Sequence, residues 1–335
     1  MRMVVLGAGA LGSLIGGYLA RAGAEVTLIG RPAHMQAIRE RGLKISGVRG
    51  EVTVGERLRA VTSPEEVEGE FDWLVLAVKG KDTASALAGA ERLRERVAAA
   101  FSVQNSVTKD DELIAWFGDP RRVIGFATIE GATLVEPGHV RNHVTVPTTA
   151  YAGELGGEIT PRVEALVAWF NQAGLGAKAV ANIRQVEWEK LAQICLASGY
   201  SVSCLAAVPH LGFADGLVVR EGAEHYVALA KEIMQVYRAL GYAPQNYFAP
   251  LSHLRELEEF PFDEAVEFAR SVGERLRERG SVGRTSMHED ILRGRRPEVD
   301  AIFAPFVREA DRLGLEVPVL RSIYRTARVW AAYLS

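Results

Sequence analysis

The chain of 335 residues is long enough for about two packed domains, and its 48% hydrophobic and 24% charged residues match an ordinary globular protein, which excludes a disordered chain. The 42 acidic and 39 basic side chains leave a net charge of −3, so no overall field would draw the protein to nucleic acid or to an anionic membrane. Two counts are unusual: lysine is scarce, with 7 residues against 32 arginines, and glycine is abundant, with 33 residues.

The first 30 residues predict a βαβ unit. Residues 3–6 form a short apolar strand, residues 7–12 a glycine-rich turn, residues 13–22 a helix and residues 25–29 a second strand. The stretch 3–20 carries no charge, but five glycines interrupt it at spacings that suit such a turn and helix. We therefore expect neither a signal peptide nor a membrane span.

The alternation of strands and helices continues through the first half of the chain. Strands are expected at residues 71–78, 100–104, 123–128, 138–146 and 149–153, and helices at residues 35–41 and 83–96. This pattern predicts an α/β fold with a doubly wound parallel sheet.

From about Pro161 the pattern becomes helical. Helices are expected at residues 161–173, 184–206, 217–240, 261–279, 297–313 and 318–333. We place the boundary between Ala177 and Ile183, which gives an α/β domain of residues 1–178 and an all-helical domain of residues 179–335.

Neither the cysteines nor the arginine-rich stretch indicates a special site. Cys195 and Cys204 fit no disulfide framework or zinc site, and we expect both to be small buried side chains in a reducing compartment. Residues 270–296 contain eight arginines interspersed with acidic residues, which is typical of a solvated helical surface rather than a nucleic-acid site.

The glycine-rich turn reads Gly7-Ala8-Gly9-Ala10-Leu11-Gly12 and lies between a strand and a helix. Gly7 permits the tight turn, Gly9 lets the backbone approach a pyrophosphate, and Gly12 lets helix and strand pack closely. We therefore predict a Rossmann-like domain that binds a dinucleotide, in preference to a merely structural turn.

The residue after the second strand indicates which dinucleotide is bound. Domains that prefer NAD place an acidic residue at the end of this strand, where it binds the ribose 2′-hydroxyl. Here the strand ends in Ile29-Gly30-Arg31, and Arg31 is placed to bind a 2′-phosphate. This favours NADP(H); the alternative is that Arg31 is one of many surface arginines.

Lys79 and Asn105 follow predicted strands, at the sheet edge where such folds bind ligands. In the helical half, Lys190 is the last cation before an uncharged stretch, with Ile194 and Ser198 on its face at i+4 and i+8. Lys190 could be a general acid or a lysine that reaches solvent from a helix end, and the spacing alone does not decide.

Glu298 follows Pro297 at a predicted helix start, where a carboxylate in the first turn is adequately explained by the helix dipole. The chain contains no HExxH, Walker or GxSxG motif, so zinc hydrolase, P-loop and α/β-hydrolase functions lack support. We expect no bound metal.

Taken together, these residues resemble the ketopantoate reductase (2-dehydropantoate 2-reductase) family over nearly the whole chain. The matching segments are GAGALG at residues 7–12, Arg31, Val78-Lys79, Gln104-Asn105, residues 131–140, the EWEKL segment at residues 187–191, and Ser286-Met287 followed by Glu298-Val299-Asp300. The resemblance implies NADPH-dependent reduction of 2-dehydropantoate to pantoate, on the route to pantothenate and coenzyme A. It also implies a cytoplasmic enzyme whose helical domain serves substrate binding and dimerisation, although a homodimer is left open.

At the matching positions, the resemblance implies that Lys190 is the general acid and that Glu298 positions the substrate hydroxyl and Lys190. Asn105 and Ser286 resemble substrate or nicotinamide contacts, and Lys79 resembles the cofactor-side lysine. The usual asparagines one and two turns beyond the lysine are replaced here by Ile194 and Ser198, which we place in the substrate site. Other departures from the family pattern are Ser106, Phe303-Ala304 and Leu320.

Three hypotheses follow. The first is a ketopantoate reductase that takes a small-molecule 2-keto acid, without nucleic-acid or membrane partners. The second is a paralogous NADPH-dependent reductase of another 2-keto acid, since the substrate residues depart from the family pattern. The third is a non-catalytic NADP(H)-binding regulator, against which the retention of Lys190 and Glu298 argues.

Overall fold

In a computed structural model, residues 1–206, 208–280 and 283–334 are described. The chain divides into two compact units, Met1–Glu187 and Trp188–Ser335, and this division falls within the long helix α6 (Ile183–Cys204). The predicted fold class is confirmed, because an α/β unit with a parallel sheet precedes a helical unit.

The central sheet of the first unit has five parallel strands in the order β5-β2-β1-β6-β7. Their bounds are β1 Arg2–Leu6, β2 Glu25–Ile29, β5 Leu58–Val61, β6 Phe71–Leu76 and β7 Val97–Ser102. These strands are almost continuously apolar because both faces of the sheet are covered. In β1, Met3 and Val5 pack in one core cluster and Val4 and Leu6 in another, as the strand period of two requires.

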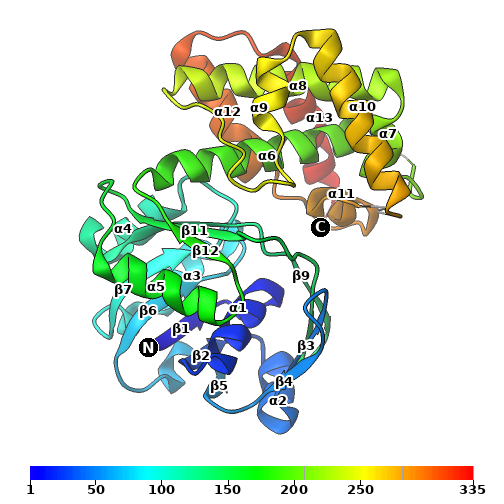
Figure 1. Ribbon diagram of the computed structural model, residues 1–335. Coiled ribbons are helices and arrows are strands. Elements are labelled where there is room, and N and C mark those ends of the chain that lie inside the picture. Colours follow the sequence, from blue (N-terminus) through cyan, green and yellow to red (C-terminus); the bar gives the residue numbers. More distant parts are fainter. Residues whose placement is uncertain (207, 281–282, 335) are drawn as a thin grey trace. The chain divides into compact units, whose positions relative to one another are not determined.

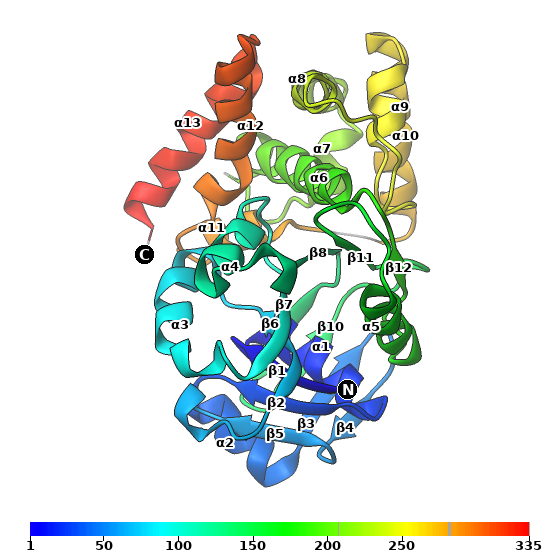
Figure 2. The ribbon, with the colours of Figure 1, turned by 90° about the vertical axis from the view of Figure 1, so that its left-hand side faces the viewer.

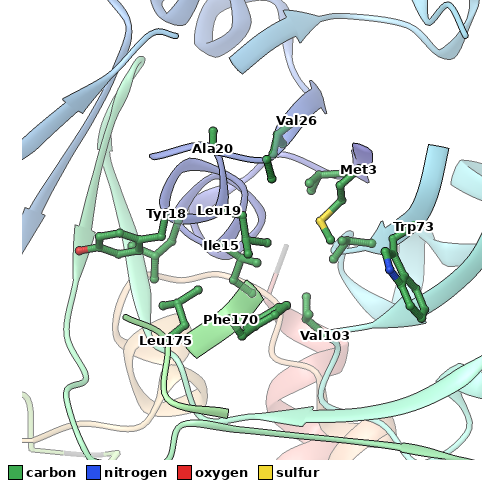
Figure 3. Close-up of a cluster of buried hydrophobic side chains, with 14 of the residues drawn as sticks. Met3, Ile15, Tyr18, Leu19, Ala20, Val26, Trp73, Val103, Phe170 and Leu175 are labelled. Atoms are coloured by element: carbon green, nitrogen blue, oxygen red, sulfur yellow. The ribbon is translucent and has the colours of Figure 1, made fainter. Parts of the chain in front are cut away.

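Helices cover both faces of this sheet. Helices α1 (Ala10–Arg21), α2 (Pro32–Arg41) and α5 (Pro161–Gln172) contribute to one cluster, and α3 (Thr83–Gly89) and α4 (Lys109–Phe117) contribute to the other (Figure 2). The larger cluster gathers Met3, Ile15, Leu19 and Phe170 around the sheet (Figure 3). Side chains of α1 and of the central strands therefore belong to one hydrophobic core.

Two smaller sheets complete the first unit. One has the order β4-β3-β10-β9 and the other the order β12-β11-β8. Their strands are β3 Leu43–Gly47, β4 Val52–Val54, β8 Ile124–Thr128, β9 Ala132–Glu136, β10 His139–Asn142, β11 Ala150–Glu154 and β12 Ala177–Ala179. Helix α1 lies against the first of these sheets as well as against the central sheet. A Cβ on Gly17 would lie 2.7 Å from the side chains of Leu43 and Ile45 in β3. A Cβ on Gly16 would lie 2.7 Å from the side chain of Leu28 in β2 of the central sheet.

The second unit is built from helices (Figure 1). They are the greater part of α6, α7 Phe213–Leu217, α8 Arg220–Ala239, α9 Leu254–Glu259, α10 Phe262–Glu278, α11 Ser286–Leu292, α12 Val299–Leu313 and α13 Pro318–Tyr333. Helix α8 packs against α7, α9, α10, α12 and α13.

Most predicted elements are present with ends shifted by up to three residues, and three of them differ in ways that have a local cause. The helix expected at residues 217–240 begins three residues later, at Arg220 of α8, because Val219 adopts an extended backbone, and the short helix α7 that ends at Leu217 was not predicted. The helix expected at residues 83–96 ends at Gly89, since Ala90 leaves helical geometry and a short 3₁₀ turn, Glu91–Leu93, follows. The strand expected at residues 138–146 is only His139–Asn142.

Cys195 is buried and Cys204 is exposed, and both are free thiols. The expectation that both are buried is therefore wrong for Cys204, which is the last residue of α6. Within the described residues, no helix is both long and apolar enough to cross a membrane.

Candidate active site

The glycine-rich turn joins β1 to α1, and its three glycines have different surroundings. Gly7 has a φ of +102°, and a Cβ there would lie 2.5 Å from the backbone nitrogen of Val78. A Cβ on Gly12 would lie 2.6 Å from the carbonyl oxygen of Gly7. A Cβ on Gly9 would meet no atom of the described residues within 4 Å beyond its own chain neighbours. Gly7 and Gly12 are thus required by the fold, whereas the open side of Gly9 leaves room for a ligand.

The turn also leaves backbone donors at the start of α1. Gly9 is the N-cap residue, its carbonyl accepts the Ser13 N–H at 3.0 Å, and the first turn of the helix contains no acidic residue. The preceding N–H groups, those of Ala10, Leu11 and Gly12, have no acceptor within the helix. These donors, at the positive end of the helix dipole, fit the pyrophosphate of a dinucleotide.

The end of β2 is hydrogen-bonded to the same glycine-rich turn. The carbonyl oxygen of Ile29 accepts the N–H groups of Gly7 at 3.2 Å and Ala8 at 2.8 Å, and a Cβ on Gly30 would lie 3.0 Å from the Ala8 carbonyl oxygen. The next residue, Arg31, is exposed and is the N-cap residue of α2. Arg31 therefore stands beside the glycine-rich turn.

A buried histidine braces this arrangement. The Gly138 N–H donates to His34 Nδ1 at 2.8 Å, and His34 Nε2 lies 2.9 Å from Ser13 Oγ. Burial lowers the pKa of His34, and because Nδ1 accepts, the proton of the neutral ring is on Nε2 and is donated to Ser13. The side chain thus links α1 and α2 to the turn between β9 and β10.

Lys79 and Asn105 follow β6 and β7 beside the same turn. The backbone nitrogen of Val78 lies against Gly7, and Lys79 comes next, exposed. Gln104 Nε2 donates to the Val78 carbonyl oxygen at 2.9 Å, and the exposed Asn105 follows Gln104. Because β2, β1, β6 and β7 are neighbours in the sheet, Arg31, the glycine turn, Lys79 and Asn105 share one edge of it, where doubly wound folds bind ligands.

The second unit contains Lys190, Ile194 and Ser198 on α6. Their spacing places them on one face of the helix; Lys190 is 6% exposed, Ser198 is buried and Ile194 is partly exposed. A lysine that merely reaches solvent from a helix end does not fit so small an exposure. Next to Lys190, the buried Glu189 has a different role, since its carboxylate accepts the backbone N–H groups of Gln245 and Tyr247 at 2.8 and 2.9 Å.

Glu298 and Ser286 lie on other elements of the second unit. Glu298 is the N-cap residue of α12, one position before the first turn, and its side chain makes no capping hydrogen bond to the helix backbone. Ser286 is the exposed first residue of α11. Helix α12 packs on α6, where the rings of Trp188 and Phe306 meet edge to face at 5.3 Å.

Two departures from the family pattern are explained by packing. Phe303 is fully buried beside Gly199, with its ring 6.3 Å from that of Tyr324. Leu320 is also fully buried, and its N–H donates to Glu232 at 2.8 Å. Both residues pack between helices, which leaves Ile194 and Ser198 as the departures on the face of Lys190.

Sequence reasoning missed a buried group of charged residues in the first unit, namely Lys109, Asp110, Arg184 and Glu187. Lysine scarcity could have identified Lys109, one of only seven lysines. The acidic residues that follow Lys109 instead suggest a solvated helix start, although its side chain is only 2% exposed. In the part of the chain that the structure describes, no group of three or more His, Cys, Asp or Glu residues could hold a metal ion.

Two family models match the chain. "Ketopantoate reductase PanE/ApbA" matches residues 3–157, and "Ketopantoate reductase PanE/ApbA C terminal" matches residues 182–331. The 2-dehydropantoate 2-reductase of Pyrococcus abyssi is 31% identical over 323 residues, which cover 95% of this chain and 94% of that protein. The 2-dehydropantoate 2-reductase of Archaeoglobus fulgidus is 29% identical, with 98% of this chain and 97% of that protein covered.

Solved structures share the fold over the full length. The PanE/ApbA family ketopantoate reductase from Ralstonia eutropha JMP134 has a TM-score of 0.77 and 26% identity, with 99% of both chains covered. A ternary structure of D-mandelate dehydrogenase with NADH and anilino(oxo)acetate has a TM-score of 0.76 and 20% identity, again with 99% of both chains covered.

Proposed function

The chain belongs to the ketopantoate reductase family, and on this premise we propose that it reduces 2-dehydropantoate to pantoate with NADPH. The observation that carries the proposal is the shared sheet edge, where an open Gly9 and the free N–H groups of α1 stand beside Arg31, Lys79 and Asn105. A reductase of this family also needs a proton donor, and the second unit supplies Lys190.

The proposed roles follow from the chemistry of carbonyl reduction. Bound NADPH supplies a hydride to C2 of the 2-keto acid, and the developing alkoxide then needs a proton. The ammonium group of Lys190 donates that proton to the C2 oxygen, which gives the hydroxyl of the product, and it is reprotonated from solvent. Glu298 orients the substrate hydroxyl and Lys190, while Asn105 and Ser286 bind the substrate. Lys79 binds on the cofactor side.

Arg31 and Lys79 bring positive charge to the edge that would bind a phosphorylated dinucleotide. The chain places no acidic residue at the end of β2 to repel a 2′-phosphate, and the exposed guanidinium of Arg31 can bind one through two parallel hydrogen bonds. We therefore assign NADPH rather than NADH as the reductant.

A substrate panel tests the function. NADPH oxidation is followed by absorbance with 2-dehydropantoate and with a series of aliphatic and aromatic 2-keto acids. A kcat/KM for 2-dehydropantoate well above the rest supports the proposal, whereas a value no better than the others contradicts it. Binding of NADPH without turnover of any 2-keto acid would instead support a non-catalytic regulator.

Lys190→Ala tests the proton donor. We expect kcat to fall by roughly 100-fold or more, as general-acid contributions of 10² to 10⁴ imply, with NADPH affinity unchanged. Lys44→Ala is the control, because Lys44 is a partly exposed lysine that pairs with Glu51 on the surface. Equal activity of Lys190→Ala and Lys44→Ala would exclude Lys190 as the acid.

Arg31→Ala tests the cofactor preference. Loss of the charge-assisted contact with the 2′-phosphate, which is exposed and worth about 1.5–3 kcal/mol, should weaken NADPH binding by roughly 10- to 100-fold and leave NADH binding unchanged. Arg39→Ala, an exposed arginine on the same helix α2, is the matched control. Equal weakening of both cofactors by Arg31→Ala contradicts the assignment to the 2′-phosphate.

A second candidate function is the reduction of another 2-keto acid. Ile194 on the face of Lys190 favours it, because this apolar side chain stands where the family usually has an asparagine. A pocket without that polar partner discriminates less in favour of a polyhydroxylated substrate. The aromatic members of the panel distinguish this function from the first.

A further inference from the structure

Four charged residues are clustered where α4 and α6 begin, and three of their side chains are buried. Lys109 Nζ contacts a carboxylate oxygen of Glu187 and lies 3.3 Å from Asp110 Oδ1. Arg184 Nη1 lies 3.0 Å from Asp110 Oδ2 and 3.7 Å from Glu187 Oε2. The side chains of Lys109, Asp110 and Glu187 are at most 2% exposed, and that of Arg184 is 33% exposed.

This buried network also holds backbone groups of two other segments. Glu187 Oε1 accepts the N–H of Phe126 in β8 at 3.1 Å. Arg184 Nη1 donates to the carbonyl oxygen of Val107 at 3.4 Å. Val107 is two residues beyond Asn105, so the network fastens the segment that carries Asn105 to the first turn of α6.

Stability alone does not account for the network. Burying charges is costly, and replacing a buried ion pair by apolar side chains of similar volume is often neutral or stabilising. The cost is visible at Glu187, where burial raises the pKa to about 7 despite the opposing charge of Lys109. Ion pairs differ from apolar contacts because their hydrogen bonds are directional. A buried ion pair therefore fixes the geometry of its side chains more closely than apolar packing does.

We propose that the buried network is a positioning device that holds the Asn105 segment against the α6 turn leading to Lys190. Lys190 follows Glu187 by three residues, or about 4.5 Å along the axis of the same helix. A change in the backbone of this first turn would therefore also move the backbone of Lys190. The catalytic consequence rests on the proposed function, in which Asn105 and Lys190 both contact substrate. A misplacement of about 1 Å at such groups can reduce turnover by roughly 100-fold.

The test replaces the central pair by apolar residues in the full-length protein. The double variant Lys109→Met/Glu187→Leu removes both charges of the central pair. It also takes one partner from Asp110 and the acceptor from the Phe126 N–H, so we expect it to fold with a melting temperature a few degrees below that of the wild type. Its kcat should fall by roughly 10- to 100-fold while its NADPH affinity stays unchanged. The control is Arg49→Met/Glu130→Leu, which replaces another buried ion pair of the same unit, with side-chain exposures of 13% and 1%.

Amide hydrogen exchange provides a measurement that does not depend on the substrate. The amides of residues 187–190 should exchange faster in Lys109→Met/Glu187→Leu than in the wild type, and should be unchanged in the control. If the wild type reduces 2-dehydropantoate and the stably folded double variant keeps the full kcat, the positioning role is overturned while the function stands. If the wild type reduces no 2-keto acid, the function fails, and unchanged exchange at residues 187–190 would then overturn the positioning role separately.

If Lys109→Met/Glu187→Leu does not fold, Glu187→Gln takes its place. This variant keeps the size of the side chain and an oxygen that can accept the Phe126 N–H, but it removes the charge that holds Lys109. Faster exchange at residues 187–190 together with a lower kcat supports the network, and wild-type values of both overturn it.

Discussion

Gly9→Ala should weaken cofactor binding without destabilising the fold. In the glycine-rich turn, a Cβ on Gly9 would meet no described atom within 4 Å, and the backbone φ of −84° suits any residue. Alanine is a poorer N-cap than glycine, which costs up to about 1 kcal/mol of stability. Alanine also lowers the conformational entropy of the unfolded chain, which stabilises the folded protein by a similar amount. The melting temperature should therefore change by no more than about 2 °C.

The added methyl group of Gly9→Ala would instead occupy the space in which we propose that the pyrophosphate binds. Overpacking of a close contact costs about 1–3 kcal/mol, which corresponds to a roughly 5- to 150-fold weaker binding of NADPH. The affinity can be measured by titration of NADPH fluorescence and the stability by scanning calorimetry. Wild-type NADPH affinity in Gly9→Ala would refute the assignment of this turn to the cofactor.

Gly12→Ala is the matched counterpart, one turn of helix away. Its Cβ would lie 2.6 Å from the carbonyl oxygen of Gly7 and 3.1 Å from the side chains of Val5 and Ala77, so backbone and strand must shift. This substitution should cost about 1–3 kcal/mol and lower the melting temperature by roughly 2–10 °C. A fully stable Gly12→Ala would show that the packing argument for this glycine is wrong.

Two further predictions concern stability. Because burial raises the pKa of Glu187 from 4.5 to about 7, its contribution to the free energy of unfolding is fully present below about pH 4.5 and is lost as the pH rises through about 7. Between pH 5 and pH 8, the wild type should therefore lose stability relative to Glu187→Gln in urea unfolding, and an equal pH dependence of the two proteins would contradict this. Glu232 accepts the N–H groups of Val319 and Leu320 at the start of α13, so Glu232→Ala should cost about 1–2 kcal/mol, as a lower melting temperature would show; an unchanged one would mean that water replaces the carboxylate.

The sequence predicted those elements that carry a strong local signal. Strand β2 has the predicted bounds, because its apolar run ends at glycines on both sides, and α13 begins at Pro318 and ends at Tyr333 as predicted. The break between α7 and α8 has no proline to mark it. It follows from packing, since Gly216 and Gly222 approach so closely that a Cβ on Gly222 would lie 2.2 Å from the Gly216 carbonyl oxygen. The short strands β3, β4, β5 and β12 were missed because three to five residues of mixed polarity carry little periodic signal.

For the site, the residues that follow strands were the predictable ones. A doubly wound sheet collects the ends of its strands at one edge, so Arg31, Lys79 and Asn105 could be placed from topology alone. The residues that support this edge of the sheet could not be predicted in the same way. Gln104 and His34 act through partners distant in the chain, Val78 and Gly138, and only the folded structure brings these together.

The two glycines in the middle of α1 affect how the protein folds. Gly16 and Gly17 let sheet side chains approach the helix from two directions, but each makes an isolated helix less stable by about 1 kcal/mol relative to alanine. A helix of 12 residues with such a sequence does not persist alone in water. We therefore expect α1 to form only when the strands on both sides have assembled. The glycine-rich turn at its start would then be among the last parts of the first unit to take shape, although it lies within the first twelve residues of the chain.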